Sequence, residues 1–364
     1  MRRHRDMRRH RAILSAVLIG SVCAPILAGE LAPPAADAAG FEGVPDPAAE
    51  LFELPEPWSV LKSRGLPPEE LLDEVVTLDH DVPISEGRTL RLRETFTPRS
   101  WLRWPRRAVL FLGSAFSRGD LWSVPVPGYD GTALMARRGF FAYTVDYLGV
   151  GDSYRPRDGL ESTFEANQEA LKTVLRYVRA RRAVPLVDLV AESWGGVHAI
   201  YLGADAGRVR AAVLSTMTYE VAARPEFLTQ EFLGFLDSLE HHYFPMGPEF
   251  FQELTTGAPP EVTAWATRTQ PGLYLITHFR DSILQGLPHF DPGVARAPAM
   301  IVSGSLDRPE DGRRLAQAYG TRGAEFSLIE GAGHGPRLET PESARRYWEI
   351  VVDFLDPNPT ESHP

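Results

Sequence analysis

The sequence predicts an α/β fold in which helices cover both faces of a mostly parallel sheet. Short apolar runs of strand length alternate with longer segments of helical periodicity over most of the chain. Such alternation is typical of strand–helix–strand units, whose crossover helices bury both faces of the sheet. The most distinctive polar and glycine-rich motifs directly follow predicted strands, and in this architecture the carboxyl ends of the strands share one edge. We therefore expect these motifs to meet there.

The predicted elements follow one another in a simple order. A hairpin opens the fold, with strands at 74–82 and 89–96 joined by a turn at Ser85-Glu86-Gly87. Later strands are expected at 107–112, 140–145, 183–190, 210–216, 299–303 and 325–329. Helices are expected near 131–138, 164–182, 196–204 and 341–355, the last of them amphipathic.

The segment Val190-Ala191-Glu192-Ser193-Trp194-Gly195-Gly196 places a serine between a predicted strand and a predicted helix. A sharp turn at this point would project the Ser193 hydroxyl clear of the backbone, provided that small residues flank it. Ala191 and Gly195 supply the small residues two positions before and after it. The segment therefore indicates a serine nucleophile.

Two further motifs follow in the chain, each after an apolar strand. Gly304-Ser305-Leu306-Asp307 comes first, and Gly331-Ala332-Gly333-His334 follows it. With this Ser–Asp–His order the chain resembles the α/β-hydrolase superfamily with a cap domain, over about residues 75–355. The resemblance implies that Ser193 is the nucleophile, His334 the general base and acid, and Asp307 the carboxylate that orients the imidazole. Asp307 could instead cap a helix beginning near Pro309, in which case Glu220 is the substitute acid.

The same resemblance identifies an oxyanion site. Gly113 matches the family's His-Gly loop after a core strand, whereas Leu112 replaces its histidine. We expect the backbone N–H groups of Ser114 (or its neighbour Ala115) and Trp194 to bind the oxyanion. Residues 146–153 match the family's D-x-x-G-x-G-x-S loop, whose role is mainly structural.

Between Tyr219 and Ala297 the strand–helix alternation stops, at the place where capped members of the superfamily carry a helical lid. The insertion is crowded with aromatic residues: Phe227, Phe232, Phe235, Tyr243, Phe244, Phe250, Phe251, Trp265, Tyr274, Phe279 and Phe290. Most should pack the lid onto the body, yet their number also favours an apolar acyl or aromatic pocket. The lid glutamates either form a solvated helix face or hold a substrate amine, namely Glu226, Glu231, Glu240, Glu249 and Glu253.

The amino terminus has the layout of a secretory signal peptide. Arginines at 2, 3, 5, 8, 9 and 11 precede an apolar run over 12–28, and small-residue sites follow it. The predicted organisation is a signal and processing region (1–38), a lead-in (39–70), the first part of the core (71–218), a helical cap (219–297) and the second part of the core (298–364). The protein is then expected to be secreted, to the cell envelope or beyond, without stable membrane association.

Composition excludes several function classes. A formal net charge of −10 argues against binding to nucleic acid or to anionic membranes. The single cysteine, Cys23, lies inside the predicted signal, and His241-His242 has no further ligand at metal-binding spacing. No metal or organic cofactor is expected.

These observations predict a secreted serine hydrolase that cleaves an ester, thioester or lactone of a largely apolar small molecule through an acyl-enzyme. Three alternatives stay open. Ser193-Trp194-Gly195-Gly196 resembles the S-W-G-G sequence of proline iminopeptidases, which predicts an exopeptidase. The same fold also hosts lyases, in which a serine–histidine pair moves protons during elimination in small-molecule biosynthesis. A non-enzymatic binding protein would require a broken triad, whereas all three members are present here.

Overall fold

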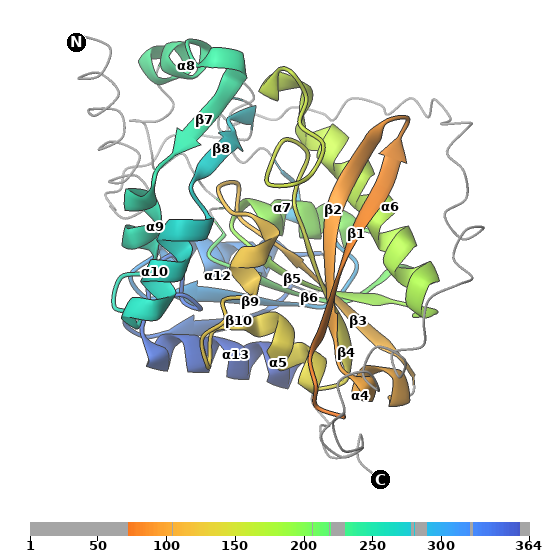
Figure 1. Cartoon of the computed structure of the whole chain (residues 1–364). Coiled ribbons are helices and arrows are strands. Elements are labelled where there is room, and N and C mark those ends of the chain that lie inside the picture. The colour runs from red at the N-terminus through yellow and green to blue at the C-terminus, as the bar shows by residue number, and fades with distance from the viewer. Residues whose placement is uncertain are drawn as a thin grey trace.

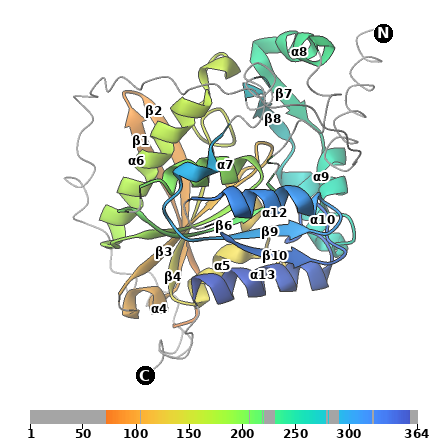
Figure 2. The same cartoon turned by 180° about the vertical axis from the view of Figure 1, so that it is seen from behind.

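An eight-stranded sheet forms the centre of the protein (Figures 1 and 2). The computed structural model describes residues 72–356 except 104, 206, 218, 220–229, 278–279, 281–289 and 321–322. The strand order is β1-β2-β4-β3-β5-β6-β9-β10, in which β1 and β2 are antiparallel to their neighbours and the remaining pairs are parallel. The predicted signal peptide, the lead-in and Glu220 lie outside the described residues.

The strands coincide closely with the predicted ones, with bounds β1 Val76–Ser85, β2 Arg88–Phe96, β3 Arg107–Leu112, β4 Phe140–Val145, β5 Val187–Glu192, β6 Val209–Ser215, β9 Ala299–Gly304 and β10 Glu325–Ile329. The largest difference is in β5, which starts at Val187 although the prediction begins it at 183, because α6 extends to Arg182 and Ala183 ends that helix. In the opening hairpin, β1 continues past Pro83 to Ser85 although the prediction ends it at Val82. A proline is tolerated there because β1 is an edge strand, and the pairing register shifts between Pro83 and Ser85.

Helices cover both faces of the sheet, as predicted. One layer contains α6 (Phe164–Arg182), α7 (Trp194–Leu202) and α12 (Pro309–Ala318), and the other contains α5 (Gly131–Arg137) and α13 (Pro341–Leu355) (Figures 1 and 2). Each layer buries its own apolar cluster against the sheet. The short helices outside these layers are α4 Pro98–Leu102, η1 Gly119–Trp122, η2 Gly159–Glu161 and η5 Pro292–Val294.

The segment between β6 and β9 stands beyond one end of the sheet (Figure 1). It contains α8 (Gln230–Asp237), α9 (Pro248–Leu254), α10 (Pro260–Thr269) and η4 (Glu240–His242), in keeping with the expected helices. It also contains an antiparallel pair, β7 (Tyr243–Met246) and β8 (Gly272–Leu275), which the purely helical prediction did not include. The two strands come from distant parts of the insertion, so their pairing was not visible as a local hairpin.

Hydrogen bonds connect this segment between β6 and β9, the cap, to the core. Gln270, at the end of α10, donates to the Asp120 carboxylate at 2.6 Å and accepts from the Arg118 N–H at 3.0 Å. The Tyr243 hydroxyl donates to the Pro156 carbonyl at 3.0 Å. The His241-His242 pair has no metal-like arrangement: His242 contacts Asp158 at 2.9 Å, and the His241 side chain is 56% exposed.

Buried ion pairs hold the amino ends of the parallel strands. Asp188 in β5 contacts Arg107 of β3 at 3.0 Å and Arg210 of β6 at 2.7 Å. Asp356, just after α13, contacts Arg103 at 2.6 Å and Arg107 at 3.0 Å. Because three strands and the last helix share these charges, the network fixes their relative positions at this end of the sheet.

Candidate active site

Ser193 lies at the tight turn between β5 and α7, as predicted. Its backbone has φ 53° and ψ −121°, a conformation that costs free energy for any residue other than glycine. The turn is held by hydrogen bonds on both sides: the Ser193 N–H donates to the Ser215 carbonyl, and the Gly196 N–H donates to the Ser193 carbonyl, both at 2.9 Å. A strained backbone that its neighbours keep in place is typical of a functional residue.

The glycine two positions after Ser193 is required by a close backbone approach. A Cβ atom on Gly195 would lie 2.4 Å from the Gly113 carbonyl oxygen and 2.6 Å from that of Leu112. Both distances are well below van der Waals contact, and neither backbone oxygen can swing aside. The elbow therefore packs directly against the loop that follows β3, which is the predicted oxyanion loop.

Asp307 and His334 meet at the carboxyl end of the sheet. Asp307 follows β9, His334 follows β10, and the Asp307 carboxylate lies 2.9 Å from Nδ1 of His334. Burial opposes protonation of this imidazole, but the charge and hydrogen bond of Asp307 raise the His334 pKa above its ordinary value. With Nδ1 engaged by the carboxylate, Nε2 is the nitrogen left to exchange a proton with a substrate or nucleophile. Asp307 is not a helix cap, because the N-cap of α12 is Arg308.

A buried ion pair joins the serine turn to the histidine loop. Glu192, directly before Ser193, accepts a hydrogen bond from Arg337, three residues after His334, at 2.7 Å. Both side chains are almost completely buried, at 2% and 1% exposure. The Arg337 guanidinium also donates to the Leu121 carbonyl at 2.8 Å and stacks 3.8 Å from the Trp122 ring centre. This pair brings the two loops to adjacent positions, although they are far apart in the chain.

A second carboxylate holds the histidine loop itself. Glu339 accepts hydrogen bonds from the N–H groups of Gly333 and Gly335, at 2.8 and 3.0 Å. These are the residues on either side of His334, so the two hydrogen bonds fix the backbone of the histidine loop. Burial raises the pKa of Glu339, and the two N–H donors oppose that rise.

Sequence reasoning did not identify Glu192, Arg337 or Glu339 as part of this site. The one available signal was a charged residue, Glu192, at the carboxyl end of a largely apolar strand, because a buried charge requires a partner. Nothing in the sequence indicates that the partner is Arg337, which follows 145 residues later.

The predicted oxyanion loop is held on both sides. The Ser114 carbonyl accepts from the Ser117 N–H at 3.3 Å, and the Gly113 carbonyl accepts from the Tyr147 hydroxyl at 2.9 Å. The neighbouring D-x-x-G-x-G-x-S loop has the structural role expected of it. Asp146 accepts from the N–H groups of Gly119 and Asp152, at 2.6 and 3.0 Å.

No group of three or more His, Cys, Asp or Glu side chains with metal-binding geometry occurs in the described part of the chain. Within the same residues, no helix is both long and apolar enough to cross a membrane.

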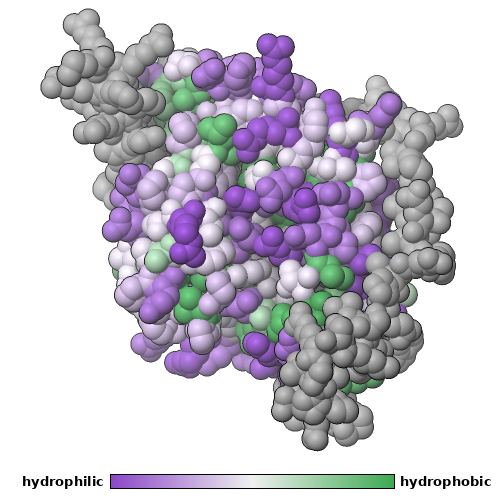
Figure 3. All heavy atoms as spheres, viewed as in Figure 1, coloured by the Kyte–Doolittle hydropathy of each residue, from purple (hydrophilic) through white to green (hydrophobic). Residues whose placement is uncertain are grey.

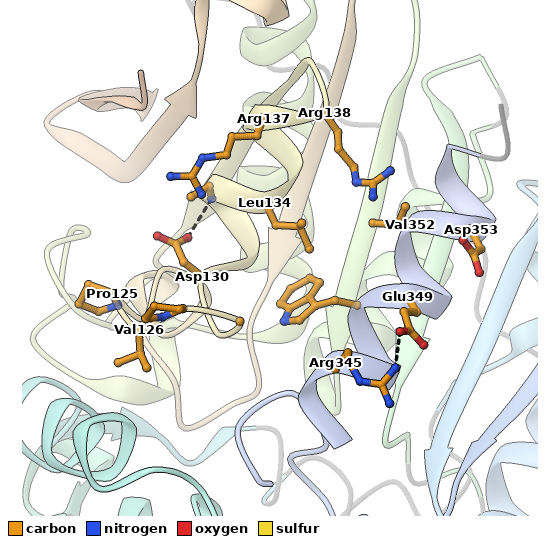
Figure 4. Close-up of a pocket in the computed structure, with 14 residues that line it drawn as sticks. Pro125, Val126, Asp130, Leu134, Arg137, Arg138, Arg345, Glu349, Val352 and Asp353 are labelled. Carbon is orange, nitrogen blue, oxygen red and sulfur yellow. Dashed lines mark hydrogen bonds and ion pairs between the residues drawn. The ribbon is translucent and has the colours of Figure 1, made fainter. Parts of the chain in front are cut away.

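A hollow of about 570 Å³ lies between α5 and α13 (Figure 4). Leu134 and Val352 line it, together with the ion pair Arg345–Glu349. Its lining includes none of the residues predicted for catalysis, so we assign it no part in the chemistry.

Comparison with known proteins places these residues in a family context. The family model described as "Alpha/beta hydrolase family" matches residues 109–345, which span the serine turn, Asp307 and His334. No curated protein matches the sequence.

Among solved structures, the chain is similar to a thermophilic esterase from Thermogutta terrifontis, with 15% identity, a TM-score of 0.54, and coverage of 79% of this chain and 100% of the esterase. An esterase from Exiguobacterium antarcticum has 13% identity and a TM-score of 0.56, over 76% of this chain and 99% of its own. An epoxide hydrolase from Vigna radiata has 16% identity and a TM-score of 0.53, over 79% and 99%. At such identities the likeness concerns the fold alone.

Proposed function

We propose that this chain, which belongs to the alpha/beta hydrolase family, is a serine hydrolase that works through an acyl-enzyme. The observation that carries the proposal is the 2.9 Å contact between Asp307 and His334, formed at the same sheet edge as the strained turn of Ser193. Nucleophile, base and orienting carboxylate are the three groups that this chemistry requires.

In the proposed reaction, the Ser193 hydroxyl attacks the acyl carbonyl and its proton passes to Nε2 of His334. Asp307 holds the imidazole by Nδ1 and stabilises its protonated form. The tetrahedral oxyanion is bound by the N–H groups of Ser114 and Trp194. Loss of one such donor typically costs ~3 kcal/mol of transition-state stabilisation. The intermediate then expels the alcohol, thiol or ring oxygen, which takes the proton from His334, and water repeats the sequence on the acyl-enzyme.

An apolar acyl or aromatic substrate is supported by the cap. Phe116, two residues beyond the proposed donor Ser114, contacts three cap aromatics, with ring centres 5.9 Å from Phe250, 6.1 Å from Tyr274 and 6.2 Å from Phe244. The described cap aromatics therefore extend to the oxyanion loop, beyond packing among themselves. We further propose, from the signal-like terminus, that the enzyme acts outside the cytoplasm.

The exopeptidase alternative receives less support from the cap. Glu231, Glu240, Glu249 and Glu253 are all exposed, as expected of a solvated helix face. A clamp for a substrate amine would require a carboxylate held at the site, whereas these four side chains are solvent-exposed. The remaining glutamate of that set, Glu226, lies outside the described residues.

The test is covalent labelling of the purified protein with a fluorophosphonate, followed by peptide mass spectrometry. We expect an adduct on Ser193 that disappears in Ser193→Ala and persists in Ser238→Ala, a matched change at an exposed cap serine. An unlabelled but folded protein, or an adduct that persists in Ser193→Ala, contradicts the proposal.

Substrate panels then separate the reaction classes. We expect p-nitrophenyl esters of medium-chain or aromatic acids to be hydrolysed faster than the acetate, and faster than alanine or proline anilides. In ¹⁸O-labelled water the carboxylate product should gain one ¹⁸O atom. A lyase would release the carboxylate without it.

A further inference from the structure

Tyr147 occupies an unusual position beneath the proposed oxyanion site. It follows Asp146 in the loop after β4, and its side chain is buried, with 1% exposure. Its hydroxyl donates to the carbonyl oxygen of Gly113 at 2.9 Å. The chemistry described above makes no use of this tyrosine, and the bond joins two loops that follow different strands.

The peptide that Tyr147 holds is the one that carries a proposed oxyanion donor. The Gly113 carbonyl and the Ser114 N–H belong to the same peptide unit, which is planar and trans. In such a unit the C=O and N–H bonds point in opposite directions. A hydrogen bond that fixes the direction of the Gly113 oxygen therefore also fixes the direction in which the Ser114 N–H points.

The tyrosine ring also contacts the residue that carries the second proposed donor. The rings of Tyr147 and Trp194 meet edge to face, with centres 5.2 Å apart and planes at 70°. Both pack on the His198 imidazole, which is 5.4 Å from Tyr147 and 4.3 Å from Trp194. Tyr147 thus touches both sides of the site that would bind the oxyanion.

The surroundings leave Tyr147 little freedom. His198 is stacked on Phe164 at 4.6 Å, and its Nδ1 lies 2.8 Å from the Gln168 amide nitrogen. Burial lowers the pKa of His198 to about 3, so this ring stays neutral at working pH. Burial also raises the pKa of Tyr147, so its hydroxyl stays a donor.

The geometry points to Tyr147 as a positioning residue for the oxyanion hole, acting through the peptide between Gly113 and Ser114. This inference rests on the proposed serine hydrolase function and adds a residue to it. Without the phenolic hydroxyl, the buried Gly113 oxygen loses the donor that the structure gives it. Its peptide can then rotate toward another donor, which turns the Ser114 N–H away from the developing oxyanion.

The test compares Tyr147→Phe with the wild type on a p-nitrophenyl ester. We expect kcat to fall by about 10- to 100-fold, because a donor that is misaimed costs part of the 10²–10³-fold that a lost donor costs. KM should change less than threefold, since the ground-state carbonyl needs this donor less. The matched control is Tyr319→Phe, at the residue directly after α12. It removes a buried hydroxyl that has no hydrogen-bond partner among the described residues, and it should leave kcat unchanged.

Three tests separate a positioning role from general damage to the site. The Tyr147→Phe affinity for an aryl trifluoromethyl ketone, which forms a hemiketal oxyanion on the serine, should weaken by the same factor as kcat. The acid limb of the pH profile, which reports His334, should stay where it is in the wild type. Replacement of Tyr147 by p-aminophenylalanine, which keeps an N–H donor at the para position, should restore most of kcat, whereas p-fluorophenylalanine should not.

The outcomes distinguish this inference from the proposed function. If Tyr147→Phe matches the wild type in kcat and in ketone affinity, the positioning role is wrong while the serine mechanism stands. If KM or the acid limb moves as much as kcat, Tyr147 is only structural. If the Tyr147→Phe variant does not fold, the p-fluorophenylalanine and p-aminophenylalanine variants replace it, since they match each other in size. Equal kcat values in these two variants would contradict the positioning role. If wild-type Ser193 is not labelled by the fluorophosphonate, the proposed function itself fails.

Discussion

The two ends of the parallel strands both bury charged side chains, but the partners of these side chains differ. At the amino end, Asp188 faces two arginines, Arg107 and Arg210, at 3.0 and 2.7 Å. At the carboxyl end, the carboxylate of Asp307 faces the imidazole of His334, whose Nε2 is the proton-transfer atom in the proposed mechanism. The amino-end carboxylate faces two oppositely charged side chains, whereas the carboxyl-end carboxylate faces the imidazole to which we assign proton transfer.

The backbone shows the same contrast. The carboxyl end holds Ser193 at φ 53° and also the left-handed residues Thr216 and Arg308, at φ 51° and 47°. At the amino end, the described strand starts carry no comparable strain apart from Ala183 at φ 49°, which ends α6. Conformational strain is concentrated where the proposed chemistry takes place, because the rest of the fold is stable enough to hold it there.

The difference between its two ends lets one sheet be both rigid and locally strained. The surface in the view of Figure 3 is mostly polar, with apolar side chains only in small patches, so stability must come from the interior. The amino-end network locks three strands and the last helix. The carboxyl end can then tolerate a strained serine and a protonatable histidine.

The largest expected effect is on activity alone. Ser193→Ala should lower kcat by at least ~10⁴-fold, because no other group can form the acyl-enzyme. Its thermal midpoint should stay close to that of the wild type, since the hydroxyl makes no described structural bond. Steady-state kinetics and calorimetry on the same preparation check this. Residual activity above a few per cent would place the nucleophile elsewhere.

The next effect should fall on stability alone. Asp188→Ala leaves two arginines facing a buried site, and breaking such a pair typically costs about 3–5 kcal/mol of unfolding free energy. Urea denaturation measures the loss, and kcat per folded molecule should not change. Asp79→Ala, which breaks a partly exposed pair with Arg93, should cost no more than about 1 kcal/mol. Equal losses of unfolding free energy in the two variants would show that the amino-end network stabilises the fold no more than an exposed ion pair does.

A smaller effect is expected on kcat and on its pH dependence. Glu192→Gln removes a buried negative charge that helps to raise the His334 pKa, together with Asp307 and against Arg308. Catalysis needs the neutral imidazole, so activity falls as pH drops through this pKa. The acid limb should therefore move to lower pH in the variant. The value of kcat should drop about 5- to 150-fold as the two loops loosen, which is the 1–3 kcal/mol of a broken charged hydrogen bond expressed as a rate ratio. A limb that stays fixed or moves upward would refute the electrostatic role of Glu192.

The smallest expected effect is a pH dependence of stability. Burial would raise the pKa of Asp356, but the hydrogen bond and charge of Arg103 and the charge of Arg107 lower it below the ordinary 3.8. Its contribution is present above the unfolded pKa and is lost as pH falls through the folded one. The unfolding free energies of wild type and Asp356→Asn should thus differ at pH 7 and converge below about pH 3.8. A difference that is constant with pH would exclude this linkage.

Much of the fold and part of the site could be predicted before the structure was known. Apolar periodicity indicated the strands and helices, and the small residues Ala191 and Gly195 indicated the tight turn at Ser193. These are local properties, since they depend on neighbours a few positions away. The β7–β8 pairing in the cap and the end of β1 were missed because they depend on distant partners or on being at a sheet edge.

The sequence alone therefore determined which residues could carry out acyl transfer and in what order they follow strands. The contacts that hold these residues became visible only in the folded protein: Arg337 with Glu192, Glu339 with the histidine loop, and Tyr147 with the Gly113 carbonyl. Chemical type and local turn geometry are properties of short segments, so they can be read from the sequence. Contacts between loops depend on strand order, which brings residues far apart in the chain to one edge of the sheet.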